Sequence, residues 1–412
     1  MQPTPTRINR DAALAWYRKN RERTARLFDL LTDDAYYAQP ISLRHPIVFY
    51  EGHIPAFSLN TLIKTALGRS GVDERLEQLF ARGIDPDETP AGATTVEPTA
   101  ESNRARWPDR QEVRRFVDAA DAVYTILEHE AMHQETLLYI WHRLPFEQKR
   151  APADYRPVLE GPPATVEAIR IPAGTARLGA EPGELAFGWD NEFHAVEVPV
   201  GAFSIDSHNV TNGAFLEFVE AGGYSQQALW TPENWAWVRE HGLDHPPFWD
   251  RDGHRWMWRG MFEALPLPLQ WPVYVSHAEA DAYARWQGAR LPTEAEYHRA
   301  ASPFPAGGVH DFISWDPHPV GSYAMGRAEN GVADLTGNGW EWTSTIFAPF
   351  PGFSAGASYP EYSADFFDDA HHVMKGASPA TARELVRPTF RNWFRPRYPY
   401  VYATFRCIRE GA

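Results

Sequence analysis

The segment Gln111–His142 contains neither proline nor glycine and is rich in residues that favour helices. Proline and glycine are the residues that most often interrupt a helix, so an unbroken run of this length predicts one long helix.

His129 and His133 lie four residues apart in this segment, within the sequence HEAMH. Residues at that spacing project from the same face of a helix, so the two imidazoles can bind one metal ion. The same spacing is also compatible with ordinary surface or core histidines. HEAMH further matches the H-E-x-x-H pattern of zinc metalloproteases, in which Glu130 would be the general base. A zinc metalloprotease is therefore a second hypothesis.

Three further helices are predicted upstream of this segment. Asn9 or Asp11 can cap the first, and Pro55 lies inside the second, where it predicts a kink or a later start. Residues 83–108 are rich in Pro, Asp, Thr and Ala and are typical of a long surface loop. Four helices with one long connection predict an up-and-down bundle over residues 1–150. The predicted helices cover about residues 11–31, 46–67, 73–81 and 111–142.

The second half of the chain has a different pattern. Residues 144–163 contain five prolines and predict an interdomain linker. One helix is predicted over His277–Gln287, and Thr293 with Glu296 has the spacing of a capping box at the start of another. The sequence therefore predicts an α+β protein whose second, loop-rich domain covers residues 165–412. Predicted strands include Val166–Ile171, Val196–Val200 and Phe203–Asp206.

Composition limits the functions that remain. A net charge of −15 argues against a non-specific nucleic-acid binder and against an anionic membrane surface. The single cysteine, Cys407, excludes an intramolecular disulfide and is compatible with a reducing compartment. The first residues lack an apolar signal core, and no apolar stretch reaches the length of a membrane span. We expect a cytoplasmic protein that binds small molecules, with neither a nucleic-acid nor a membrane partner.

A third candidate ligand, His53, lies in the sequence FYEGHIPAF of the second predicted helix. The cores of helical bundles are a regular place for metal sites, because side chains from facing helices converge there. A lone histidine in such a position is more often a core residue. Together with His129 and His133 it can form a three-nitrogen face that leaves coordination positions open.

Four segments of the second half occur in a characteristic order, and each taken singly is typical of a packing or turn motif. Their order over about residues 171–409, together with the G-H-x-x-x-F and H-x-x-x-H-x-E helices, resembles the ergothioneine-type sulfoxide synthases. The resemblance implies a non-haem iron enzyme with a DinB-like four-helix bundle, followed by a formylglycine-generating-enzyme fold, a variant of the C-type lectin fold. The four segments are Phe187–Glu192, Val210–Asn212, Arg290–Glu296 and Gly337–Trp342.

The resemblance also implies roles for particular residues. The three histidines correspond to the family's iron(II) ligands, and Glu135 corresponds to an outer-shell partner of those ligands. The sequence FRNW at 390–393 corresponds to a family motif in which Asn392 and Trp393 hold the betaine of hercynine, the trimethylated histidine. A quaternary ammonium cannot donate an N–H hydrogen bond but binds well to an aromatic face. Ordinary core packing is the alternative role of Trp393.

Several positions depart from the family's pattern. Family members that use γ-glutamylcysteine have Asp after FRNW, where this chain has Phe394, and an Arg-containing segment where this chain has the acidic loop Ile84–Thr89. An acidic loop repels the two carboxylates of that dipeptide. Met132 replaces the Gln that commonly precedes the second histidine of the helix, so we include it among the substrate-binding candidates. Tyr359 is the nearest candidate for the family's catalytic tyrosine.

These departures predict a changed donor, as in the selenoneine synthase branch of the family. The main hypothesis is an iron(II)- and oxygen-dependent enzyme that joins a selenosugar to the imidazole of hercynine through a C–Se bond. The alternative is a sulfoxide synthase that joins a thiol such as cysteine or γ-glutamylcysteine to hercynine. Two hypotheses of other classes remain, namely the zinc metalloprotease and a non-catalytic lectin-like binding module. The donor, the proton donor, the order of substrate binding and the oligomeric state do not follow from the sequence.

Overall fold

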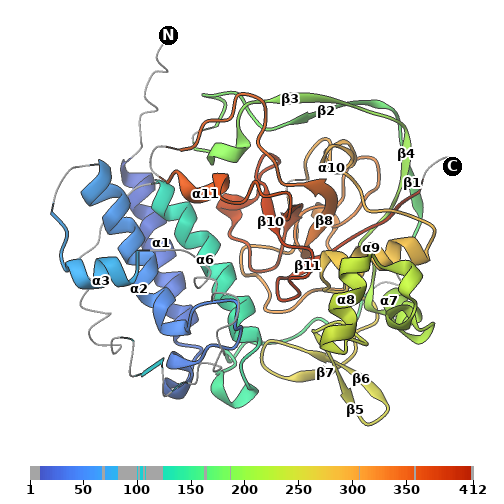
Figure 1. Ribbon diagram of the computed structural model, residues 1–412, viewed down its shortest axis with the longest axis horizontal. Coiled ribbons are helices and arrows are strands. Elements are labelled where there is room, and N and C mark those ends of the chain that lie inside the picture. Colours follow the sequence, from blue (N-terminus) through green and yellow to red (C-terminus); the bar gives the residue numbers. More distant parts are fainter. Residues whose placement is uncertain are drawn as a thin grey trace. The chain divides into compact units, whose positions relative to one another are not determined.

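The structure is a computed structural model of the 412-residue chain, in which two compact units, Arg7–Asp154 and Tyr155–Ala412, are each described separately. Within the described part of the chain, no helix combines the length and the apolar character needed to cross a membrane. Figure 1 labels the helices and most of the strands of the two units. The described residues are 10–66, 70–81, 100, 103, 104, 107, 124–161, 165–185, 187–305, 307–356 and 359–409.

The described part of the first unit is helical. Helix α6 packs against α1 and α2. Asn20 of α1 makes two hydrogen bonds to α6. Its side-chain Nδ2 donates to the Leu127 carbonyl (2.7 Å), and its backbone carbonyl accepts from the Gln134 side chain (3.0 Å). The first half of the predicted helix 111–142 and the acidic loop 84–89 lie outside the described residues. The helices are α1 (Arg10–Phe28), α2 (Ile47–Ser58), α3 (Glu74–Leu79) and α6 (Tyr124–His142), with 3-10 turns at Asp33–Tyr37 and Phe146–Gln148.

Helix α2 continues beyond its proline. It begins after Pro46 and passes through Pro55, and its last turns, Leu59–Ala66, are wound as a wider π-helix. Proline lacks an N–H group, so it cannot make the hydrogen bond of a regular helical turn, and a change of winding nearby accommodates this loss. Over its described residues, the predicted range of about 46–67 is therefore continuous, but it is not a regular α-helix.

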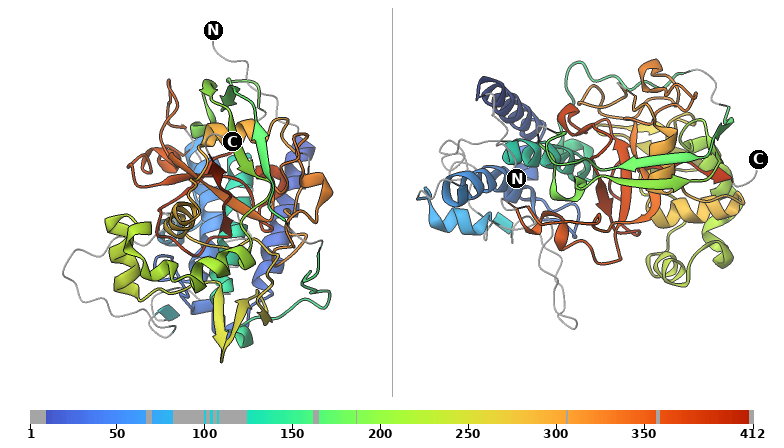
Figure 2. Two further views of the ribbon diagram at one scale, coloured as in Figure 1. Left: turned by 90° about the vertical axis from the view of Figure 1, so that its right-hand side faces the viewer. Right: turned by 90° about the horizontal axis from the view of Figure 1, so that it is seen from above.

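The second unit combines four small sheets with short helices, as Figures 1 and 2 show. The sheet orders are β10-β9-β8-β11, β1-β4-β12, β2-β3 and β5-β6-β7. The strands are β1 (Ala168–Ile171), β2 (Gly174–Leu178), β3 (Val196–Val200), β4 (Phe203–Asp206), β5 (Trp249–Asp252), β6 (Arg255–Arg259), β7 (Ala264–Pro266), β8 (Gly339–Ile346), β9 (His372–Ala377), β10 (Asn392–Phe394), β11 (Ala403–Thr404) and β12 (Ile408–Arg409). The helices are α7 (Asn212–Glu220), α8 (Pro232–His241), α9 (His277–Trp286), α10 (Glu294–Ala300) and α11 (Glu361–Ala364).

The sequence motifs of this unit turn out to build its core. Glu341 of β8 forms an ion pair with Arg406, and both side chains are fully buried. Gly337, just before β8, has a φ of 89°, and a Cβ there would meet the Val309 backbone nitrogen at 2.4 Å. Only glycine fits such a close approach in that conformation. The GNGWEW segment therefore serves packing as well as any role in a site.

The predicted helix starts of the second unit agree with the structure, and so do two of its three predicted strands. The strand predicted over Val166–Ile171 begins later, at Ala168. Strands β3 and β4 have the predicted bounds, and α9 begins at the predicted His277. The Thr293 hydroxyl accepts from the Glu296 N–H at 3.2 Å, while the Glu296 carboxylate accepts from the Thr293 N–H at 2.8 Å. This is the reciprocal pattern of a capping box. Helix α10 begins at the following residue, Glu294.

Candidate metal centre and substrate strand

The structure brings the three predicted histidine ligands together in the first unit. His53 of α2 and His129 and His133 of α6 offer nitrogen atoms that all lie within 4.8 Å of one another. The Nε2 atoms of His129 and His133 are 3.1 Å apart. All three side chains are at most 3% exposed. Within the described residues, this is the one cluster of three or more metal-binding side chains.

The orientation of His53 is fixed by its surroundings. Its Nδ1 lies 2.7 Å from the Phe80 carbonyl oxygen, which can only accept, so Nδ1 carries the proton and Nε2 is left as a ligand atom. The Phe80 ring packs directly on Gly52, where a Cβ would approach it to 2.4 Å. The GH dipeptide of the sequence motif therefore lets Phe80 come close enough to hold the histidine.

The three imidazoles are neutral. Burial lowers the pKa of His53 to about 4, and burial together with the neighbouring histidines lowers the pKa of His129 well below its usual value. The pKa of His133 is likewise well below its usual value, because of burial, His53 and Arg44. A neutral imidazole has one unprotonated nitrogen with a lone pair. Two such nitrogens that face each other repel unless a proton or a cation lies between them. The donor set fits a divalent transition metal.

Glu130, the general base of the protease hypothesis, faces away from the histidines. Its carboxylate accepts from the Thr24 hydroxyl at 2.7 Å and lies 3.1 Å from the Arg21 guanidinium, both on α1. Burial raises its pKa, while Arg21 opposes that shift. A metalloprotease needs this carboxylate beside the metal-bound water. The structure therefore gives Glu130 a role in packing α1 on α6 and argues against the protease.

Two other predicted residues of α6 occupy different positions from the ligands. Met132 is partly buried, one residue before His133. Glu135 is 8% exposed and follows His133 by two residues, which corresponds to roughly 200° around a helix. It therefore leaves the helix on another face than His133. The outer-shell role of Glu135 and the substrate role of Met132 stay predictions.

In the second unit, Trp393 of β10 is one member of an aromatic cluster. Its ring is stacked on Phe347, with centroids 4.2 Å apart and planes at 6°. Tyr362 meets it edge-on at 5.2 Å and Phe366 lies at 5.6 Å with a tilt of 52°. Trp393 is only partly buried. One face of the indole is therefore covered, and the cluster leaves part of the ring accessible.

A buried ionic network fixes the chain just before β10. Arg391 binds both oxygens of Glu294 at 3.1 Å, and its guanidinium lies 5.0 Å from the centre of the Phe347 ring. Lys375 donates to the Phe390 carbonyl at 2.6 Å and to the Pro388 carbonyl at 2.9 Å. Burial lowers the pKa of Lys375 to about 8, while Glu294 opposes this shift. The backbone that leads to Asn392 and Trp393 is thus held on both sides.

Tyr359 lies near this cluster. Its ring is 5.9 Å from that of Tyr362, which in turn stacks on Trp189 at 3.8 Å. Burial, together with the nearby carboxylates of Glu361 and Asp365, raises the pKa of Tyr359 to about 12. The Trp189 motif therefore supports the segment that carries the candidate tyrosine.

Phe394 has neighbours that the sequence did not indicate. It stacks on Tyr398 with centroids 5.1 Å apart and planes at 20°, and it pairs across the sheet with His372. His372 stacks in turn on His277 at 3.7 Å. Sequence patterns missed both histidines, because they are nearly a hundred residues apart and neither lies in a recognisable spacing with another ligand.

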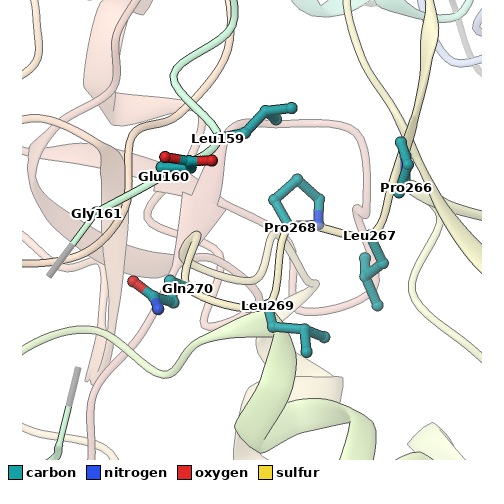
Figure 3. Close-up of a pocket in the computed structure, with 8 residues that line it drawn as sticks. All are labelled: Leu159, Glu160, Gly161, Pro266, Leu267, Pro268, Leu269 and Gln270. Atoms are coloured by element: carbon teal, nitrogen blue, oxygen red, sulfur yellow. The ribbon is translucent and has the colours of Figure 1, made fainter. Parts of the chain in front are cut away.

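Two surface pockets of the second unit lie among other residues. The first has a volume of about 490 Å³ and is open to solvent, with Glu160 as its one charged side chain (Figure 3). The second has a volume of about 340 Å³ and includes His310 and Arg383. Neither contains a predicted site residue. The lining of the first is Leu159, Glu160, Gly161, Pro266, Leu267, Pro268, Leu269 and Gln270.

Comparison with known proteins gives matches over both units. The model of the sulfatase-modifying factor enzyme 1-like domain matches residues 159–411. Hercynine oxygenase of Mycolicibacterium smegmatis is 31% identical, over 94% of this chain and 96% of that protein. Hercynine oxygenase of Mycolicibacterium thermoresistibile is 32% identical, over 94% of this chain and 92% of that protein. Ergothioneine biosynthesis protein 1 of Schizosaccharomyces pombe is 28% identical, over 92% of this chain and 54% of that protein.

Converging histidines in a helical unit, followed by a domain of the sulfatase-modifying factor type, define a two-unit class of protein with a candidate metal centre. The chain belongs to the sulfatase-modifying factor enzyme 1-like family, in the group that includes the hercynine oxygenases. The predicted resemblance to the ergothioneine-type family and the formylglycine-generating-enzyme-like second domain are thereby confirmed.

Proposed function

We propose that this protein is a metal- and oxygen-dependent enzyme that joins a chalcogen donor to hercynine. The observation that carries the proposal is a buried cluster of three neutral histidines in a chain similar to hercynine oxygenases along nearly its whole length. An activity on hercynine, with chemistry of the ergothioneine type, is supported by all these relatives. The identity of the metal and of the donor belongs to the proposal.

Iron(II) is the metal we propose for His53, His129 and His133. Three imidazole nitrogens with open positions suit a redox-active first-row metal that must also accept substrates. When bound, such an ion supplies the one-electron chemistry with oxygen that protein side chains lack. The helical unit is proposed to be a DinB-like four-helix bundle within residues 1–150, and the second domain is proposed to cover 165–412.

Residues of β10 are proposed to bind hercynine. The partly accessible ring of Trp393, with Tyr362 and Phe366 beside it, offers aromatic surface to the trimethylammonium group. The Asn392 side-chain oxygen accepts from the Trp393 N–H at 2.9 Å, which orients the amide. Its Nδ2 group carries two N–H donors that can bind the betaine carboxylate. Tyr359 remains protonated at neutral pH, because its pKa is about 12, and is proposed as the proton donor.

A thiol such as cysteine or γ-glutamylcysteine is the donor that the relatives favour, since they are named for hercynine oxygenation and ergothioneine biosynthesis. The selenosugar remains a second candidate because of one observation. The side chain of Phe394, which stacks on Tyr398, is a hydrocarbon ring and so has neither a carboxylate nor another hydrogen-bond acceptor for a substrate amine. Met132 is proposed to contact substrate in either case.

Anaerobic reconstitution with iron(II) and hercynine, followed by oxygen and one donor at a time, tests the proposal. Cysteine, γ-glutamylcysteine and a selenosugar are compared, and products are identified by mass spectrometry. A sulfur- or selenium-bearing hercynine adduct that forms only with iron and oxygen is the expected result. Zinc retention with no product from any donor would contradict it and would favour the non-catalytic binding module.

A further inference from the structure

One short turn of the second unit, Trp189–Glu192, contacts two segments that lie much further along the chain. Its last three residues form a 3-10 helix. Asp190 contacts a residue of α11 that is 173 positions later, and Glu192 contacts the segment before β10, 195 positions later. The first of these segments adjoins Tyr359, and the second leads to Trp393. The turn therefore connects the candidate proton donor with the candidate hercynine-binding strand, and the proposed function has not used this connection.

Asp190 holds the first segment through its carboxylate. One oxygen accepts from the Ser363 hydroxyl of α11, and the other accepts from the Gly356 N–H at 3.3 Å. The Gly356 carbonyl in turn accepts from the Tyr359 N–H at 3.3 Å. Ser363 is completely buried. The carboxylate therefore fixes the backbone on both sides of the candidate proton donor.

Glu192 holds the second segment in a similar way. Its carboxylate, which is completely buried, binds the Arg387 guanidinium at 2.5 and 2.8 Å and accepts from the Thr389 hydroxyl at 2.5 Å. The Asn191 carbonyl accepts from the Arg391 guanidinium at 3.4 Å. These contacts anchor the backbone that continues directly into β10.

Neither segment is held by regular secondary structure alone. Helix α11 has four residues and β10 has three, so the positions of Tyr359 and Trp393 depend on the side chains that anchor them. The aromatic contacts follow the same arrangement, since Trp189 stacks on Tyr362 at 3.8 Å and Tyr362 meets the Trp393 ring edge-on at 5.2 Å. The turn is thus a common support for both residues.

The carboxylate of Asp190 acts through hydrogen bonds and not through charge pairing. It forms no ion pair within the described part of the chain. Burial raises its pKa, while the hydrogen bonds from Ser363 and from the Gly356 backbone oppose the shift. A carboxylate that is partly removed from water without a cation is unfavourable for folding. Its contribution here is therefore the geometry of the hydrogen bonds that it accepts.

We propose that Asp190 is a positioning residue for the proton donor. The hydrogen bonds that it accepts from Ser363 and Gly356 hold Tyr359 at a fixed place relative to the hercynine-binding strand, which Glu192 holds from the same turn. Proton transfer needs the donor within hydrogen-bonding reach, and a displacement of about 1 Å can reduce the rate by roughly a hundredfold. The inference rests on the proposed function, and it predicts that loss of Asp190 affects turnover more than hercynine binding.

Steady-state kinetics of the iron(II)-loaded protein test this inference, with hercynine, oxygen and either cysteine, γ-glutamylcysteine or a selenosugar as the donor. We expect Asp190→Ala to lower kcat by at least about tenfold, while the calorimetric Kd for hercynine changes by less than about threefold. Asp190→Asn should retain most of kcat, because its amide oxygen can accept from the Gly356 N–H and its amide nitrogen can donate to the Ser363 oxygen.

Asp316→Ala is the matched control. Asp316 is another buried carboxylate of the second unit that accepts from a hydroxyl, that of Tyr155 at 2.8 Å, and from a backbone N–H, that of Met261 at 3.0 Å. Its loss removes the same kind of hydrogen bonds at a position away from Tyr359. We therefore expect this variant to lose stability but to keep kcat.

Fluorine NMR adds a readout that does not depend on turnover. With 3-fluorotyrosine incorporated at position 359, the resonance should shift or broaden in Asp190→Ala and keep its wild-type position in Asp190→Asn and Asp316→Ala. Ser363→Ala removes one of the two anchoring hydrogen bonds. It should change the resonance and kcat in the same direction by a smaller amount, which keeps the test valid if Asp190→Ala does not fold.

Several outcomes would overturn the positioning role of Asp190. They are an unchanged kcat or an unmoved fluorine resonance in Asp190→Ala and Ser363→Ala, an equal loss of kcat in Asp190→Asn, and a loss of hercynine affinity as large as the loss of kcat. The proposed function fails separately, if no donor yields a hercynine product although the fluorine resonance responds to Asp190→Ala as expected.

Discussion

The candidate metal centre and the β10 strand differ in how the chain assembles them. His129 and His133 come from adjacent turns of one helix, and His53 comes from the helix that packs beside it. The neighbours of Trp393 come from two other segments, Phe347 after β8 and Tyr362 with Phe366 at α11, and these share no sequence pattern with β10. A site built on helical periodicity is rigid and can be read from spacing, whereas a site built from loops depends on the whole domain being folded.

The largest expected effect is at the metal centre. His133→Ala removes one of three ligand nitrogens, so we expect metal affinity to fall by more than about a hundredfold, the upper range for losing an outer-shell partner. Metal content by mass spectrometry and hercynine turnover should both approach zero. His310→Ala, in the second unit, should retain its metal. Full metal occupancy in His133→Ala would show that the cluster is not the metal site.

The next largest effect concerns the stability of the loop-rich unit. Arg406→Met leaves the Glu341 carboxylate fully buried without its partner, which is expected to cost about 3–5 kcal/mol in the free energy of unfolding. Chemical denaturation measures this change. The double variant Arg406→Met/Glu341→Leu should recover much of the loss, because no unpaired charge remains. Equal destabilisation in both would mean that packing, and not charge pairing, dominates at this position.

A smaller effect is expected at Trp393 of β10, the strand that is proposed to bind hercynine. Trp393→Leu removes the aromatic face, so hercynine should bind about tenfold more weakly, a typical magnitude for a cation on an indole. Trp393→Phe should lose less. Trp256→Leu, on the β5–β6 hairpin, is the control for removing a partly buried tryptophan elsewhere. Isothermal titration supplies the affinities, and an unaltered value in Trp393→Leu would leave Trp393 as a packing residue only.

The substitution Glu130→Gln distinguishes a hercynine-modifying metal centre from a metalloprotease site. The carboxylate packs against α1 rather than the histidines, so turnover of hercynine should stay within about threefold of wild type. Stability should fall by about 1 kcal/mol, because a charged hydrogen bond is weakened. A near-complete loss of turnover with unchanged stability would return Glu130 to the role of general base.

The smallest expected effect is a pH dependence of the stability at His372, which stacks on His277. The pKa of His372 is about 4 in the folded protein and near 6.5 when unfolded, so the unfolded state takes up the proton first. Stability from this group is therefore present above pH 6.5 and is lost as the pH falls towards 4. Unfolding curves of wild type and His372→Phe should diverge in that window and run parallel above it. Parallel curves throughout would mean that His372 does not titrate differently on folding.

The helical site could be predicted largely from the sequence, because the interactions that define it are local in the chain. The spacing of His129 and His133, the capping box at Thr293 and the start of α9 each depend on interactions within one helical turn. The π-helical end of α2 was not predicted, because the response to Pro55 depends on how neighbouring groups compensate for the missing N–H.

The loop-rich site was readable only in part. The FRNW segment indicated Asn392 and Trp393, but Phe347 lies 46 positions before Trp393 and shares no pattern with it. The stack of His277 on His372 likewise depends on tertiary structure alone. The HEAMH pattern wrongly suggested that Glu130 lies beside the metal ligands. Adjacent residues of a helix face different directions, and the pattern does not specify which neighbouring element each of them contacts.

Oxygen uptake by the iron(II)-loaded protein is the measurement that tests the central claim most directly. We predict uptake only when hercynine and a chalcogen donor are both present, and none when zinc replaces iron or when His133 is replaced by alanine. Uptake that is independent of hercynine, or that persists without the three histidines, would contradict the assignment of this cluster as the metal centre of a hercynine-modifying enzyme.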